Sequence, residues 1–192
     1  MSTRTATRLA LTMGMTSLAL MALSLSLVVL FYRSFPRLEA YENWREIMLI
    51  TPIFVAIGTL VAARRPNHPI GWLFASAGLA ASIQLVVGQY AVTSLAAAPG
   101  TLPGGAIAAW VLEPIQNAFV GILVFLLLLF PTGRLLSRRW QLVAWFTAAG
   151  IVLSVVDLGF SPGRLEDFPL ENPFGIAGMA EVLDVIAGSE SC

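Results

Sequence analysis

The sequence predicts an all-α, polytopic membrane protein with five transmembrane helices and an irregular acidic C-terminal tail. Apolar residues make up 57% of the 192 residues and charged residues only 11%, whereas ordinary soluble domains carry about 25% charged residues. Several apolar runs also exceed the ~18 residues expected of a membrane span. These two observations exclude a soluble domain.

The apolar runs define five expected spans, separated by short polar or turn-forming segments. They cover residues 9–31, 47–63, 70–97, 106–130 and 140–160. Together they form a predicted transmembrane helical domain, 1–160. The remaining residues, 161–192, are expected to form an extracytoplasmic tail that ends on the approach to a sixth helix.

Local signals place the first three spans. The first span has arginines before it but no small-residue cleavage site after it, which favours an uncleaved signal anchor. In the second span, Gly58 and Ala62 have the small-xxx-small spacing that lets a partner helix approach closely. Pro69 suits the first position of the third helix, with Asn67 or His68 near its cap.

The last two spans contain features that interrupt or begin a helix. The fourth has 25 residues and is long enough to cross the bilayer with some tilt, at about 1.5 Å of rise per residue. Pro114 is expected to kink its first half. Ser137 is a candidate N-cap for the fifth helix, because a serine side chain can accept a hydrogen bond from the first turn.

The arginines indicate which side of the membrane each loop faces. All eleven basic residues are arginine. Seven lie on one side of the alternating spans: Arg4, Arg8, Arg64, Arg65, Arg134, Arg138 and Arg139. The four others, Arg33, Arg37, Arg45 and Arg164, lie on the opposite side. The positive-inside rule therefore predicts a multi-pass membrane protein with a cytoplasmic N-terminus and an extracytoplasmic C-terminus.

Two carboxylates inside expected spans are the main candidates for chemistry, because ionisable groups within a bilayer are costly. Glu113 lies seven residues into the fourth span, and Asp157 lies three residues from the end of the fifth. With Gln116 and Asn117 they would line an outward-facing pocket for a small ligand or a proton. The alternative is that both carboxylates sit at headgroup level, satisfied by water or by a neighbouring helix.

Other chemistry has little support in the sequence. There is no phosphate-binding glycine loop, metal-ligand spacing or nucleophile–base pair, so we expect no cofactor, metal or catalytic residue. Dispersed arginines give no support for nucleic-acid binding. Arg64, Arg65, Arg134, Arg138 and Arg139 are expected to set the topology and to bind anionic lipid of the bilayer, with docking of a partner as the alternative.

Three ordered stretches resemble a known family. The first is Arg64-Arg-Pro-Asn-His-Pro-Ile-Gly-Trp-Leu-Phe74, followed by Gly78-Leu79 and Tyr90-Ala91. The second is Leu126-Leu-Leu-Leu-Phe-Pro-Thr-Gly-Arg-Leu-Leu-Ser-Arg-Arg-Trp140, and the third, weaker one is Asn172-Pro-Phe-Gly-Ile176. In this order they are similar to the N-terminal membrane region of sensor histidine kinases from high-GC Gram-positive, actinobacterial-type organisms.

This resemblance implies signal input to a two-component system, through a homodimer or a histidine kinase partner. The chain departs from the family because it carries neither a phosphoacceptor histidine motif nor the glycine boxes of the ATP site, so no catalytic residue carries over. Its end suggests a kinase truncated before its catalytic domains. The sequence thus predicts a membrane sensor module without kinase activity. A small transporter or permease component using the outer-half carboxylates, and a non-functional truncated fragment, are the alternatives.

Overall fold

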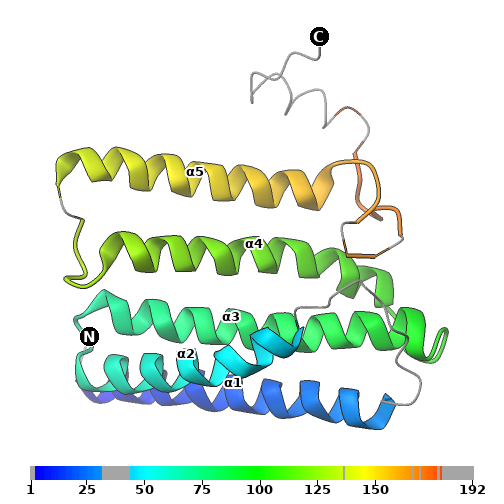
Figure 1. Ribbon diagram of the computed structural model, residues 1–192, viewed down its shortest axis with the longest axis horizontal. Coiled ribbons are helices and arrows are strands. Elements are labelled where there is room, and N and C mark those ends of the chain that lie inside the picture. The colour runs from blue at the N-terminus through cyan, green and yellow to red at the C-terminus, as the bar shows by residue number, and fades with distance from the viewer. Residues whose placement is uncertain are drawn as a thin grey trace.

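A computed structural model describes residues 3–31, 44–135, 137–165, 167–168, 170–176 and 178. These residues form a helical bundle without a named strand (Figure 1). Its helices are α1 (Thr3–Phe31), α2 (Trp44–Arg64), α3 (Pro69–Val92), a π-helical extension η1 (Thr93–Ala97), α4 (Gly105–Leu129) and α5 (Arg138–Phe160). Five helices, with η1 counted as part of the third, are long and apolar enough to cross a membrane, which confirms the predicted fold class.

The helix boundaries lie close to the predicted spans, except at the start of α1. The first helix begins at Thr3 rather than near residue 9. Its extra turns are held by packing, since Ala6 and Ala10 are fully buried and the Thr7 hydroxyl donates to the carbonyl of Ala63 at 3.3 Å. Helix α1 therefore extends beyond the apolar run because its first turns pack against α2.

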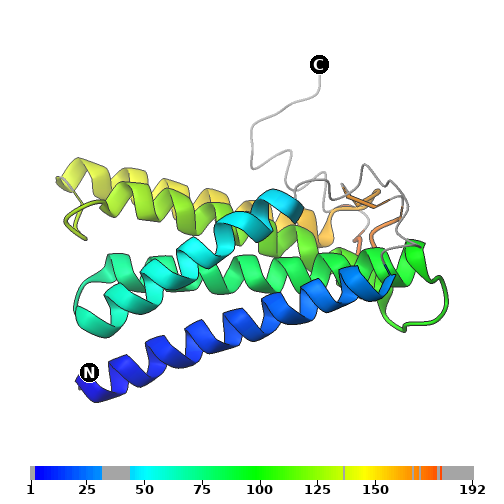
Figure 2. The same cartoon turned by 60° about the horizontal axis from the view of Figure 1, so that its bottom comes forward.

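Successive helices run antiparallel, so that the described connections lie at the two ends of the bundle (Figure 1). We call the end that holds the α2–α3 and α4–α5 connections the arginine end, and the end that holds the α3–α4 connection and residues 161–176 the tail end. Helix α3 is central and packs against α1, α2 and α4, whereas α5 packs against α4 alone among the described helices. In Figure 2, α2 crosses α3 obliquely.

Helices α2 and α3 are in direct backbone contact near the arginine end. A Cβ atom added to Gly58 would lie 2.2 Å from the backbone nitrogen of Ala75, and one added to Gly71 would lie 2.6 Å from that of Ala62. Only glycine permits such an approach, since any side chain would overlap the opposing backbone. The predicted close-packing role of Gly58 and Ala62 is confirmed, and α3 is their partner.

Both caps assigned from the sequence are confirmed as positions. Helix α3 has His68 as its N-cap residue and a proline in its first turn, as the turn sequence predicted. Ser137 occupies the N-cap position of α5, as predicted, and its side chain makes no capping hydrogen bond. The expected approach to a sixth helix, beyond residue 178, and the loop at 32–43 lie outside the described residues.

Candidate polar site at the tail end

The half of the bundle near the tail end contains polar side chains that the protein buries. Gln84 on α3 and Glu113 on α4 are each 4% exposed, and Gln89 on α3 and Thr93 on η1 are completely buried. Ser94, the next residue of η1, is also buried, and its hydroxyl donates to the carbonyl of Ala91 at 3.1 Å. Burying such groups away from water is costly unless they find partners.

Helix register places Glu113 at the same level along the bundle as the two glutamines. At the tail end, a Cβ on Gly105 would meet the side chain of Ser94, which fixes where the antiparallel helices α3 and α4 lie side by side. Glu113 follows Gly105 by about two turns, so it lies opposite the turn of α3 between Gln84 and Gln89. We call Gln84, Gln89 and Glu113 the polar layer.

Members of the polar layer differ in whether their side-chain polar atoms have interaction partners. Gln84 and Glu113 both interact with other groups of the protein. The side-chain oxygen and nitrogen of Gln89, by contrast, are buried without a hydrogen-bond partner among the described residues, and so is the hydroxyl oxygen of Thr93 one turn further along. These two residues were not singled out from the sequence. The available signal was that uncharged polar residues recur at helical spacing late in an apolar helix.

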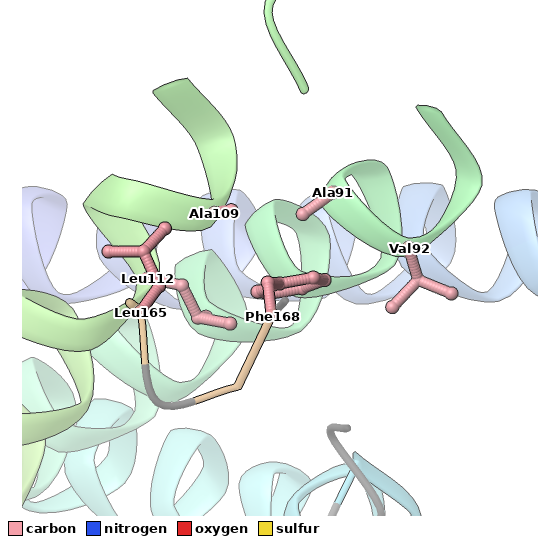
Figure 3. Close-up of a cluster of buried hydrophobic side chains, with 6 residues drawn as sticks. All are labelled: Ala91, Val92, Ala109, Leu112, Leu165 and Phe168. Atoms are coloured by element: carbon pink, nitrogen blue, oxygen red, sulfur yellow. The ribbon is translucent and has the colours of Figure 1, made fainter. Parts of the chain in front are cut away.

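The tail folds back onto this end of the bundle. Leu165 and Phe168 are buried against a hydrophobic cluster formed by α3 and α4, with Ala91 and Val92 on one helix and Ala109 and Leu112 on the other (Figure 3). Leu112 and Glu113 are consecutive residues of α4, so the tail packs at the level of the polar layer. The described residues between 161 and 176 are irregular, as predicted, but they form a packed cap.

Hydrogen bonds fix this cap to α4 and α5. The Nε2 atom of Gln116 donates to Asp167 at 2.9 Å. The side-chain amide of Asn172 donates to the carbonyls of Gly159 at 3.1 Å and Ser161 at 3.0 Å. Its oxygen accepts from the backbone N–H of Phe174 at 2.9 Å. Asn172 thus joins the end of α5 to the tail, which explains an asparagine at this position.

Of the four predicted pocket residues, Glu113 alone is deeply buried. Asp157 is exposed on α5 and accepts a hydrogen bond from the Ser161 hydroxyl. Trp110 donates to the carbonyl of Gly159 at 2.6 Å, so Glu113 and Asp157 lie at a similar level along the bundle. Their environments nevertheless differ, and Gln116 is directed to the tail. Asn117 is partly buried on α4.

The five arginines predicted to contact lipid all lie exposed at the arginine end: Arg64, Arg65, Arg134, Arg138 and Arg139. There, the two turns that contain the main family-like motifs touch. A Cβ on Gly133, whose φ is +74°, would lie 2.8 Å from the ring of Pro69 and 3.2 Å from the imidazole of His68. The motifs therefore form one structural unit, although they are far apart in sequence.

Comparison with known proteins returns no relative: no protein-family model matches the chain, and neither a curated protein nor a solved structure does. Among the described residues, no group of three or more His, Cys, Asp or Glu side chains is placed to hold a metal ion. What the fold defines is an all-helical, multi-pass membrane protein, with five candidate spans and a buried polar layer next to a packed tail.

Proposed function

We propose that this chain is the signal-input module of a bacterial membrane sensor, with the arginine end in the cytoplasm and the tail end outside. The observation that carries this proposal is the placement of the polar layer, which is buried at one end of the bundle and adjoins the tail cap. A ligand or stimulus that altered the cap would act directly on buried groups of α3 and α4. Such coupling between an external segment and a central helix is what an input module needs.

The arginine half of the bundle supports sensing rather than transport. There, α2 and α3 touch through their backbones at Gly58 and Gly71, and the facing Ala62 and Ala75 are buried. A transported polar solute would need a hydrated route through this half in at least one state. Backbone contact between two helices leaves no such route along their interface.

Output would pass to a partner at the cytoplasmic surface. The resemblance to the membrane region of sensor histidine kinases suggests a kinase partner or a homodimer, and this chain itself would have no kinase activity. The joined turns at Pro69 and Gly133, flanked by exposed arginines, provide a defined surface there. The same arginines favour the cytoplasmic side, where they contact anionic lipid headgroups.

The proposal is tested in a strain that lacks the chain. We expect phosphorylation of response regulators under envelope stress to differ from the parent strain, and to be restored by the wild-type chain. A variant with Gln116→Leu, which detaches Asp167 of the cap, should restore it poorly. Val120→Ala, an exposed change on the same helix, serves as the matched control. Identical phosphorylation with and without the chain would contradict the proposal.

Orientation is tested independently of signalling. A phosphatase that is active only outside the cytoplasm, fused after Ser189, should be active, and the same enzyme placed in the turn at 66–67 should be inactive. The reverse pattern would show that the arginine end faces outward, and the sensor proposal would then lose its external input site.

A buried carboxylate favours one competing function. Glu113 lies inside a candidate span and is 4% exposed, and carboxylates in such positions serve proton-coupled transport in other membrane proteins. Proteoliposomes containing the purified chain and a pH-sensitive dye would decide. Proton movement that disappears in Glu113→Gln would support a transporter or permease component. No proton movement with the wild-type chain would favour the sensor.

A further inference from the structure

Three polar atoms at the tail end of α3 and η1 have no partner in the part of the chain that the structure describes. They are the amide oxygen and nitrogen of Gln89 and the hydroxyl oxygen of Thr93. Both residues have no exposed surface. Since buried polar groups in native proteins are nearly always hydrogen-bonded, these three atoms require a partner that the described residues do not supply.

Helix register explains why the chain leaves these atoms unpaired. Ser82, Leu85, Gln89 and Thr93 follow one another at helical spacing and are all fully buried, so they form one continuous face. The Ser24 hydroxyl of α1 donates to the carbonyl of Leu85 at 3.3 Å, which shows that this face meets α1.

Helices α1 and α3 run in the same direction (Figure 1), so one turn further towards the tail end Val28 of α1 comes opposite Gln89. Val28 is itself buried, at 8% exposure. Its side chain has no polar atom, and therefore α1 offers Gln89 no hydrogen bond where a serine offers one to the preceding turn.

The set of unpaired atoms restricts the missing partner. The carbonyl oxygen of Gln89 requires a donor, its NH₂ group requires an acceptor, and the Thr93 hydroxyl can act as either. A metal cation would leave the NH₂ group unpaired, and an anion would leave the carbonyl oxygen unpaired. A neutral hydroxyl group satisfies both kinds of atom, because it donates and accepts at once.

We propose that Gln89 and Thr93 form a binding site for a small neutral hydroxylic molecule, either water or a small alcohol, between α3–η1 and α1. The site shares Gln89 with the polar layer but does not include Glu113. It stands independently of the sensor proposal, because the unpaired atoms need a partner whatever the protein does. A π-helical turn at Thr93 accords with this role, since such turns are frequent at functional sites.

Solid-state NMR of the full chain in lipid bilayers, with ¹⁵N-labelled glutamine side chains, tests the site directly. Magnetisation transferred from water should reach the Gln89 amide at a rate within about tenfold of that for Gln141, which is exposed on α5. Loss of one signal in Gln89→Leu assigns the peak. In deuterated water, transfer from ethylene glycol protons would instead identify a small alcohol. No transfer to Gln89 from either source would overturn the proposal.

Thermal unfolding gives a second test that does not depend on assignment. Thr93→Val keeps the shape of the side chain and removes its hydroxyl. If the site is occupied, the variant loses a hydrogen bond to the bound molecule, and its midpoint should fall by about 2–4 °C. The control is Thr16→Val on the exposed face of α1, which should leave the midpoint unchanged. An unchanged or raised midpoint for Thr93→Val would mean that the site is dry.

Discussion

Replacing Gly58 by alanine should separate the two most closely packed helices of the bundle. The added Cβ would lie 2.2 Å from the backbone nitrogen of Ala75 and 2.5 Å from its Cα, whereas ordinary contacts begin at 3.4 Å. Both obstructing atoms belong to a helix backbone, so no side chain can rotate away. Helices α2 and α3 must therefore move apart by roughly 1 Å, and a gap of that size forfeits up to about half of each dispersion contact.

The expected cost follows from overpacking of a tight interface, about 1–3 kcal/mol. Alanine also gains about 0.5–1 kcal/mol over glycine in a helix, so the net loss should be about 0–2.5 kcal/mol. Gly150→Ala provides the matched control. Gly150 is exposed on α5, and a Cβ there would meet nothing within 4 Å. The same substitution should therefore be neutral or stabilising at that position.

Unfolding of the two variants and the wild type in lipid nanodiscs measures this difference. The order of stability should be Gly150→Ala at or above wild type, and Gly58→Ala below it. If Gly58→Ala were as stable as Gly150→Ala, the backbone contact between α2 and α3 would not exist in the membrane. Backbone contact would then no longer block a hydrated route between α2 and α3 in the arginine half.

Three further outcomes are expected. Gly133→Ala should cost about 1–3 kcal/mol more than Gly100→Ala; both glycines have positive φ, but only Gly133 faces a neighbouring proline ring, so the difference in unfolding midpoint isolates that contact. Asn172→Ala should release the tail, and limited proteolysis should cut it several-fold faster than in Pro173→Ala. Trp110→Phe removes one of the two hydrogen bonds to the Gly159 carbonyl and leaves the one from Asn172, so it should cost about 0.5–1.5 kcal/mol in chemical unfolding.

The spans were predictable because hydropathy and length alone decide whether a segment crosses a bilayer. Single residues also gave correct predictions where the backbone requires a particular residue type. Pro69 marked the start of α3, and Gly58 marked a close contact between helices. The start of α1 was misplaced because its first turns carry Arg4 and Arg8, so their polarity concealed the buried Ala6 between them. Ser137 was placed correctly as the N-cap of α5, although its hydroxyl makes no capping bond.

The polar site was less predictable, because α3 is apolar on all sides and its sequence does not show which face meets which neighbour. Gln84 and Gln89 are five residues apart in sequence. Only the packed bundle shows that Gln84 lies at the level of Glu113 on α4, and that Gln89 lies on the face of α3 that packs against α1. The fold of the tail could not be predicted either. Leu165 and Phe168 are two apolar residues in a polar segment, and their burial depends on distant residues of α3 and α4.

The two halves of the bundle are stabilised in different ways, and this difference bears on how a signal would travel. Near the arginine end, α2 and α3 lie backbone to backbone, which permits little relative movement. Near the tail end, α3 ends in a π-helical turn next to unpaired polar atoms and an irregular cap. A change in the cap would therefore be accommodated first in η1 and the outer turns of α3. Because α3 runs from there to Pro69, beside Gly133, rotation or displacement of this one helix would reach the arginine end as a rigid movement.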